Sequence, residues 1–161
     1  MGKNDLAIAE MEKWVASEPN GAQANFHLGV MFLFAGRRED AIRQIETAIR
    51  LDPYPWSWSY SFLGQAYAGF FLPDGPKDLE KATQLCKKAL KINPTDGVAH
   101  RELILIYSYQ NRLEEARAQA SEMLKSHPNF SLKVVGGPLY KDKEVRKRIL
   151  ELFRKAGIPE G

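Results

Sequence analysis

The chain has 161 residues, of which 44% are hydrophobic and 27% charged, and its formal net charge is +3. This length fits one domain with a real core, and the composition excludes a disordered chain or a disulfide-stapled scaffold, since a single cysteine cannot form an internal bridge. There is no run of eighteen apolar residues and no signal peptide, which predicts a cytoplasmic protein that does not contact a membrane.

Helix-period patterns follow one another along the whole chain. The expected helices are 5–17, 22–34, 38–51, 57–70, 78–92, 97–110, 113–125 and 142–155. Proline ends four of them, because it cannot continue a helix: Pro19, Pro53, Pro94 and Pro128 are separated by 34, 41 and 34 residues. Before each proline stand two small or apolar residues seven positions apart, which is two helical turns and therefore one side of a helix. The sequence predicts a repeated pair of helices.

This frame divides the chain into repeats. The expected units are a half repeat at 5–21, full repeats at 22–56, 57–96 and 97–130, and a connector with a capping helix at 131–161. A short helix pair cannot bury its apolar stripe alone, whereas stacked neighbours form one continuous core. Small residues such as Gly29 and Gly64 are expected where helices cross most closely. The missing partner of the first helix indicates a piece of a longer protein, or a face that another subunit covers.

The second repeat is longer than the others. Its glycine and alanine markers, Gly64 and Ala82, lie eighteen residues apart instead of twelve, which places an insertion at 71–77 between its two helices. The insertion contains a Pro-Asp-Gly turn signal, and Asp78 is placed to cap the next helix. Two interpretations are open: a longer hairpin loop whose phenylalanines fold back on the helices, or a functional loop on a rigid scaffold.

The last segment of the chain breaks the frame and holds the excess of positive charge. A Val-Val-Gly-Gly-Pro run predicts an extended connector over 131–138, and a helix then resumes with an apolar stripe. The stripe consists of Val145, Ile149, Leu152, Phe153 and Ala156. The outer face is basic, with Lys143, Arg146, Lys147, Arg154 and Lys155. Clustered cations can bind nucleic acid, but acidic residues interrupt this cluster and no aromatic residue is interleaved, so we expect a solvated capping face and no nucleic-acid partner.

A fuller signature recurs three times. A Leu-Gly pair, an aromatic residue three positions later, a small residue and a terminal proline span 28–53 and 63–94, and 103–128 differs by having Ile104 in place of glycine. In these residues the chain resembles the tetratricopeptide repeat family. The resemblance implies an all-α fold, a right-handed superhelix of helical hairpins, closed here by a C-terminal capping helix.

The end of the chain carries a second resemblance. The segments PNFS at 128–131, LYKD at 139–142 and LFRKAGIPE at 152–160 are similar to the tail that follows the repeats in many bacterial class III adenylate/guanylate cyclases and related signalling proteins. This resemblance implies a regulatory C-terminal module in bacterial signalling. The chain itself has no cyclase catalytic domain with its metal-binding aspartates, so any cyclase activity would belong to another part of such a protein.

Residues suited to catalysis or to metal binding are sparse. His27, His100 and His127 have no ligand spacing between them, and Cys86 falls on a core-facing position, as a structural thiol does. No phosphate-loop, HExxH, CxxC or GxSxG pattern occurs. The sequence predicts no catalytic residues, no metal and no cofactor, and the chain is not expected to be an enzyme.

The remaining candidate site is the concave groove that first helices form in this family. The resemblance implies these groove-facing residues: Phe26, Val30, Phe34, Trp58, Gln65, Arg101, Leu105 and Tyr109. This surface is aromatic, and only Arg101 could hold a terminal carboxylate as chaperone-binding members do. An exposed apolar concavity normally indicates a protein partner. The alternative is that these aromatic residues simply pack within the superhelix.

Three functions are therefore open. The first is a non-catalytic scaffold that binds a peptide or helix of a protein partner in the aromatic groove. The second is self-association as a homodimer through the first helix, in a regulatory module of a cyclase-like signalling protein. The third is regulation by a small ligand in the groove.

Overall fold

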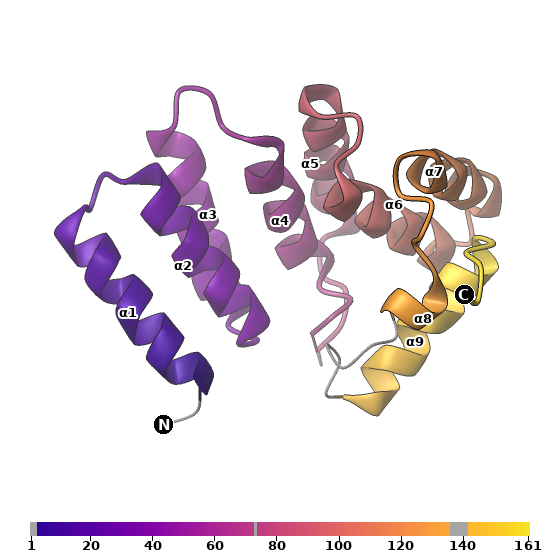
Figure 1. The fold of residues 1–161 in the computed structure, drawn as a ribbon, viewed down its shortest axis with the longest axis horizontal. Coiled ribbons are helices and arrows are strands. Elements are labelled where there is room, and N and C mark those ends of the chain that lie inside the picture. Colours follow the sequence, from indigo (N-terminus) through magenta and orange to yellow (C-terminus); the bar gives the residue numbers. More distant parts are fainter. Residues whose placement is uncertain (1–2, 73, 136–141) are drawn as a thin grey trace.

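A computed structural model describes residues 3–72, 74–135 and 142–161 (Figure 1). These residues form nine α-helices and no strand, and the fold is an all-α solenoid. The helices are α1 Lys3–Ser17, α2 Ala22–Phe34, α3 Arg38–Leu51, α4 Ser57–Ala68, α5 Leu79–Ile92, α6 Gly97–Tyr109, α7 Leu113–Ser126, α8 Leu132–Val135 and α9 Lys143–Lys155.

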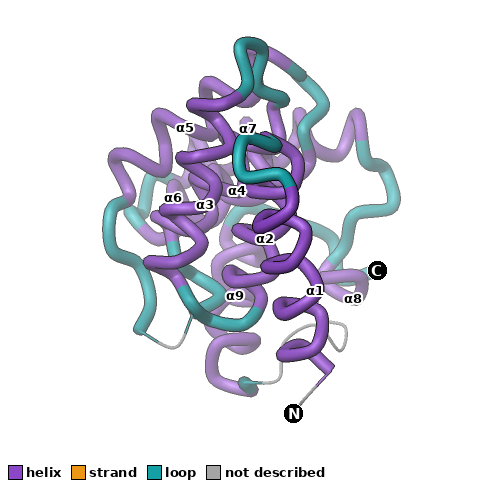
Figure 2. The backbone as a smooth tube through the Cα atoms, turned by 90° about the vertical axis from the view of Figure 1, so that its left-hand side faces the viewer, coloured by secondary structure: helices purple, strands orange, loops and turns teal. Residues whose placement is uncertain are grey.

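The helices pack in successive antiparallel pairs. α2 packs on α3, α4 on α5 and α6 on α7, and the second helix of each of the first two pairs also contacts the first helix of the next. In addition, α4 contacts both α2 and α6, and α6 contacts α9, so the first helices lie in one row that α9 extends (Figure 1). Viewed from the α1 end, α1 lies in front of this row (Figure 2). None of the described helices is both long and apolar enough to cross a membrane.

The helix ranges expected from sequence agree with the structure to within two residues at either end. One helix end has a clear local cause, as expected: the Asp78 carboxylate accepts a hydrogen bond from the backbone N–H of Lys81 at 2.9 Å and caps α5. The end of α4 also has a local cause: this helix stops at Ala68 because Gly69 adopts a left-handed conformation with φ of 63°. The insertion therefore begins at Gly69, slightly earlier than the sequence pattern places it.

The prediction of an extended connector after residue 130 is wrong over its first part, where α8 forms. Leu132 and Val135 are buried, so one helical turn places two apolar side chains on the core. The backbone N–H groups of Leu132 and Lys133 donate to the carbonyls of Pro159 and Glu160, which ties this turn to the C-terminal segment. The Gly-Gly-Pro part of the predicted connector lies outside the described residues.

Glycine sets the closest approach of the paired helices, as the spacing predicts. A Cβ atom on Gly29 would lie 2.6 Å from Cγ1 of Ile45, and one on Gly64 would lie 2.7 Å from Sγ of Cys86. Neither distance is compatible with a side chain at the crossing. The first and second helices of these pairs can therefore pack only with glycine at these positions.

The last long helix closes the solenoid. Asp142 accepts hydrogen bonds from the N–H groups of Glu144 and Val145 and caps α9. The predicted apolar stripe of α9 is buried, and Phe153 is fully buried with its ring centroid 5.5 Å from that of Phe130. The basic residues predicted for the outer face are exposed. Thus α9 covers the end of the core with its apolar side and presents its charged side to solvent.

Candidate functional site

The structure places the eight predicted groove residues at very different depths. Three are more than half exposed, namely Phe34 at 61%, Trp58 at 54% and Tyr109 at 52%. Three are buried, namely Phe26, Gln65 and Leu105. Val30 and Arg101 lie between these extremes. The residues that a partner could touch are therefore concentrated on α2 and α4, with Tyr109 at the end of α6.

Phe26 and Phe62 form an aromatic floor between α2 and α4, and Phe34 lies beside it. The ring of Phe62 meets Phe26 edge to face at 5.9 Å and Phe34 at 6.4 Å. Phe62 and Trp58 are four residues apart on α4, so they share one side of that helix. The sequence prediction omitted Phe62, although its spacing from Trp58 was a usable signal. We call the surface formed by Val30, Phe34, Trp58, Phe62 and Tyr109 the first-helix face.

The predicted groove positions on α2 and α4 are all uncharged. The one charged position is on α6, where Nε and Nη2 of Arg101 lie 3.4 and 3.3 Å from Oε1 of Glu102. The same guanidinium lies 4.9 Å from the centre of the Phe71 ring. Arg101 is thus held by its own chain, and the open part of the face offers apolar contact without a cation.

Glu102 is a buried carboxylate that sequence analysis did not identify. Its side chain is fully buried, and Oε2 has no hydrogen-bond partner in the described part of the chain. Burial raises the pKa of Glu102 to about 7, against the opposing effect of Arg101. The sequence contains a signal for this burial, because the apolar residues Ala99 and Ile106 lie three positions before and four positions after Glu102, on the same side of α6.

The insertion after α4 packs back onto the row of first helices, as one of the two interpretations anticipated. Phe70 is fully buried, and its ring meets Tyr109 at 5.6 Å with an interplanar angle of 66°. Leu72 is also buried. From α9, Nη2 of Arg148 donates to the carbonyl oxygens of Phe70 at 2.8 Å and Leu72 at 3.4 Å. The insertion therefore covers part of α6 and connects α4 to the capping helix.

A second arginine fixes the other end of the insertion. Arg38 is only 3% exposed, and its Nη2 donates to Asp74 Oδ1 at 2.8 Å and to the carbonyl of Gly75 at 2.7 Å. A side chain on Gly69 would collide with this guanidinium. Sequence analysis gave Arg38 no role. A cation at the first residue of a helix opposes the helix dipole, which indicates that this side chain has a compensating partner elsewhere in the chain.

The histidines and the cysteine do not assemble into a reactive centre. His100 Nε2 lies 2.8 Å from the carbonyl of Pro94, His27 stacks on Trp14, and His127 Nδ1 lies 2.9 Å from Ser126 Oγ. Cys86 is fully buried, and burial together with the nearby carboxylates of Glu102 and Asp96 raises the pKa of its thiol. Among the described residues no group of histidine, cysteine and acidic side chains is placed to hold a metal ion.

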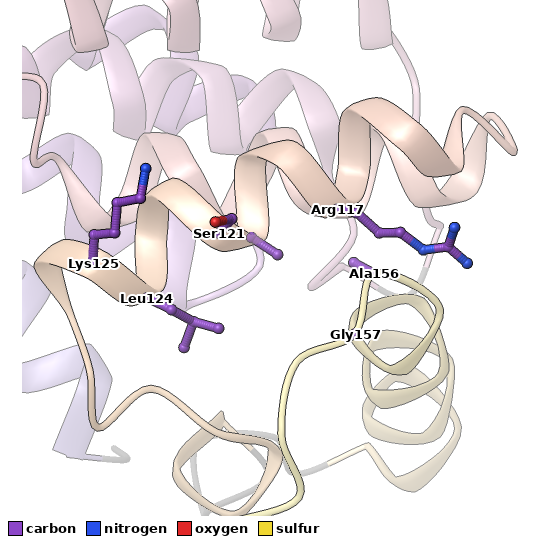
Figure 3. Close-up of a pocket in the computed structure, with 7 residues that line it drawn as sticks. Arg117, Ser121, Leu124, Lys125, Ala156 and Gly157 are labelled. Carbon is purple, nitrogen blue, oxygen red and sulfur yellow. The ribbon is translucent and has the colours of Figure 1, made fainter.

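A hollow of about 430 Å³ lies between α7 and the end of α9 (Figure 3). Leu124 points toward the gap, whereas Lys125 points away from Gly157. Lys125 and Arg117 at its rim form ion pairs with Glu122 and Glu114 on the same helix. The polar groups of this hollow do not converge on a common point, so it has no arrangement suited to catalysis.

Helix pairs that cross at glycine, end at proline and stack around one core define a helical-hairpin repeat protein. The chain belongs to the tetratricopeptide repeat family: two models of this family, both described as tetratricopeptide repeat, match residues 1–54 and 75–132. None of the curated proteins matches the sequence significantly.

Crystal structures of similar fold cover nearly the whole chain. MamA is 24% identical with a TM-score of 0.66, over 96% of this chain and 87% of MamA. A thermophilic TPR protein of Thermus thermophilus, TTC0263, is 21% identical with a TM-score of 0.68, over 96% and 82%. YrrB, described as a TPR protein with an unusual peptide-binding site, is 20% identical with a TM-score of 0.59, over 96% and 76%. At these identities the likeness is one of fold.

Proposed function

We propose that this chain is a non-catalytic scaffold that binds a peptide or helix of a partner protein on the first-helix face, with Phe34 and Trp58 as the main anchors. The observation that carries this proposal is the exposure of these two side chains beside an aromatic floor. Large aromatic residues supply much of the binding energy of protein interfaces. Tetratricopeptide repeats form protein-interaction scaffolds, which supports the same role.

The depths of the remaining predicted residues give them separate parts in this proposal. Val30 and Tyr109 extend the contact surface, whereas Phe26, Gln65 and Leu105 shape it from below, since they are buried. Arg101 contacts Glu102 and the Phe71 ring of the insertion, so its guanidinium holds the insertion in place and is not a free cation for a partner. The open face is apolar and neutral, which favours an uncharged apolar segment over a terminal carboxylate. In this role the protein acts in the cytoplasm, without a cofactor, nucleic acid or membrane.

Replacing Phe34 with aspartate together with Trp58 with alanine is expected to remove binding on this face. The probes are peptides selected from a random library for binding to the full chain, with affinities measured by isothermal titration calorimetry. We expect at least about a 30-fold loss, because two aromatic anchors are removed. Both side chains are more than half exposed, so the helix content should stay unchanged. Phe26→Asp is unsuitable, since it would bury a charge.

Tyr54→Ala is the matched control. Tyr54 is an aromatic residue that is 86% exposed in the turn between α3 and α4, and it is not part of the first-helix face. Its removal should change the affinity of the selected peptides by less than roughly two-fold. Selected peptides that bind the Phe34→Asp/Trp58→Ala variant as tightly as the unmodified chain would contradict the proposal.

A second candidate function is self-association through α1, as in a regulatory module of a cyclase-like signalling protein. The observation that favours it is a shallow hollow of about 390 Å³ between α1 and α2. Its lining is mainly apolar and includes Met11, Trp14 and Met31. Static light scattering across a concentration series tests this candidate. We expect the molar mass to rise toward that of a dimer if α1 pairs with a second copy, and a constant monomer mass would exclude the pairing.

A further inference from the structure

The insertion shows how this fold holds an apolar turn against a first helix, since the backbone N–H of Leu72 donates to the carbonyl of Gly69 at 3.1 Å. Phe70 places its ring edge to face on Tyr109, and Phe71 lies beneath the Arg101 guanidinium. Arg148 holds the main-chain carbonyls of Phe70 and Leu72. Ring contact at the end of α6 and hydrogen bonds to the main chain thus fix a Phe-Phe-Leu segment from the chain itself.

Phe34 occupies in α2 the position that Tyr109 occupies in α6. Each is the last residue of its helix, and each follows by six positions the leucine of the repeat signature, Leu28 or Leu103. The two rings differ in what covers them. Tyr109 receives Phe70 and is 52% exposed, whereas Phe34 meets the ring of Phe62 at 6.4 Å and is 61% exposed. Phe70 reaches Tyr109 from the α4–α5 connection of the preceding pair, since the α6–α7 turn has three residues, as the α2–α3 turn does.

We propose that the partner places an aromatic side chain against Phe34 in the way that Phe70 packs against Tyr109, within an uncharged, turn-forming segment of the Phe-Phe-Leu type. This inference rests on the proposed function and names the class of partner. It follows from the repeat register, which gives the two sites the same backbone position and an aromatic side chain in each. The absence of charge at the predicted groove positions of α2 and α4 fits such a segment.

The insertion of a second copy is not the occupant. Phe70 is fully buried and Leu72 is 4% exposed within their own chain, so a second copy would have to open its insertion before it could donate these residues. The hydrogen bonds from Arg38 and Arg148 would be broken in that step. A segment of a different protein carries no such cost.

The test uses a synthetic peptide with the sequence Gly-Phe-Phe-Leu-Pro, acetylated and amidated at its ends, which copies residues 69–73 without a charge. It is titrated into the full isotope-labelled chain and followed by 1H–15N NMR. We expect saturable shifts in α2 and α4 around Phe34 and Trp58, and no saturable shifts with a peptide in which both phenylalanines are alanine. Phe34→Ala should weaken binding by roughly ten-fold or more, since an edge-to-face contact and its buried area are lost. Tyr54→Ala should leave binding unchanged.

Three results would overturn the inference. The first is the absence of saturable shifts, and the second is an affinity that Phe34→Ala does not change. The third is a set of shifts centred on α6 and the insertion, which would mean that the peptide displaces the insertion from Tyr109. The library peptides separate this inference from the proposed function. If they require Phe34 and Trp58 but contain no aromatic residue, the scaffold function stands and the inference about its partner is wrong.

Discussion

Replacing Phe153 with alanine is expected to lower the free energy of unfolding by about 4 kcal/mol. Phe153 is fully buried on the side of α9 that packs into the core, and its ring meets Phe130 at 5.5 Å. Removing this ring leaves a cavity beneath α9, between this helix and the core that it covers. Urea denaturation followed by circular dichroism measures the change.

Phe34→Ala is the matched control for this prediction, because the same side chain is removed from a position that is 61% exposed. We expect a loss of about 1 kcal/mol or less there, mainly from the contact with Phe62. Equal losses for the two variants would contradict the assignment of α9 as a packed cap. A loss of only about 1 kcal/mol for Phe153→Ala would also contradict this assignment, whatever the result for Phe34→Ala.

The second large effect is expected in the pH dependence of stability, through Glu102. Its pKa of about 7 in the folded chain compares with 4.5 for an ordinary glutamate, because burial disfavours the charged carboxylate. Between these values the unfolded chain loses a proton that the folded chain keeps. The contribution of Glu102 to stability is therefore most favourable below pH 4.5, falls as the pH rises toward 7, and is lower by about 3 kcal/mol above that pH.

Glu102→Gln isolates this effect, since glutamine resembles the protonated acid and does not titrate. The difference in unfolding free energy between Glu102→Gln and the unmodified chain should be near zero at pH 4.5 and grow to about 3 kcal/mol in favour of the variant above pH 7. Chemical denaturation at a series of pH values gives the difference directly. A difference that does not change with pH would show that Glu102 ionises at its ordinary pKa.

Glu115→Gln provides the control. Glu115 is exposed, and hydrogen bonding to Arg112 lowers its pKa. A lowered pKa contributes stability above pH 4.5 that is lost only as the pH falls through the folded value. This variant should therefore show no change in its stability difference between pH 5 and 7, where the effect of Glu102 is steepest.

The helices and their pairing could be predicted from sequence because local signals decide them. Seven-residue spacing, terminal proline and the capping residue Asp78 act within one or two turns of a helix. The glycines at the helix crossings belong to the same class, since the repeat places Gly29 and Gly64 at the same step of each pair. The one missed helix, α8, forms where two apolar residues pack on the core, and its backbone bonds reach a segment almost thirty residues away.

The candidate site could be predicted only in part because exposure depends on neighbouring helices. Phe26 and Leu105 occupy groove positions according to the repeat register, but both side chains are buried. The ring of Phe62 packs against Phe26. The insertion depends on contacts that no local pattern contains. Arg38 and Asp74 are 36 residues apart, and Arg148 and Phe70 are 78 residues apart. Such pairs are set by how the solenoid brings its helices together.

The most direct test of the scaffold function is a map of where a bound segment lies. Hydrogen exchange of the full chain, measured by mass spectrometry with and without a library-selected peptide, provides that map. We predict slower exchange in α2 and α4, strongest toward Phe34, with α1 and α7 unchanged. Protection confined to the α1–α2 hollow, or to the hollow between α7 and α9, would contradict binding on the first-helix face.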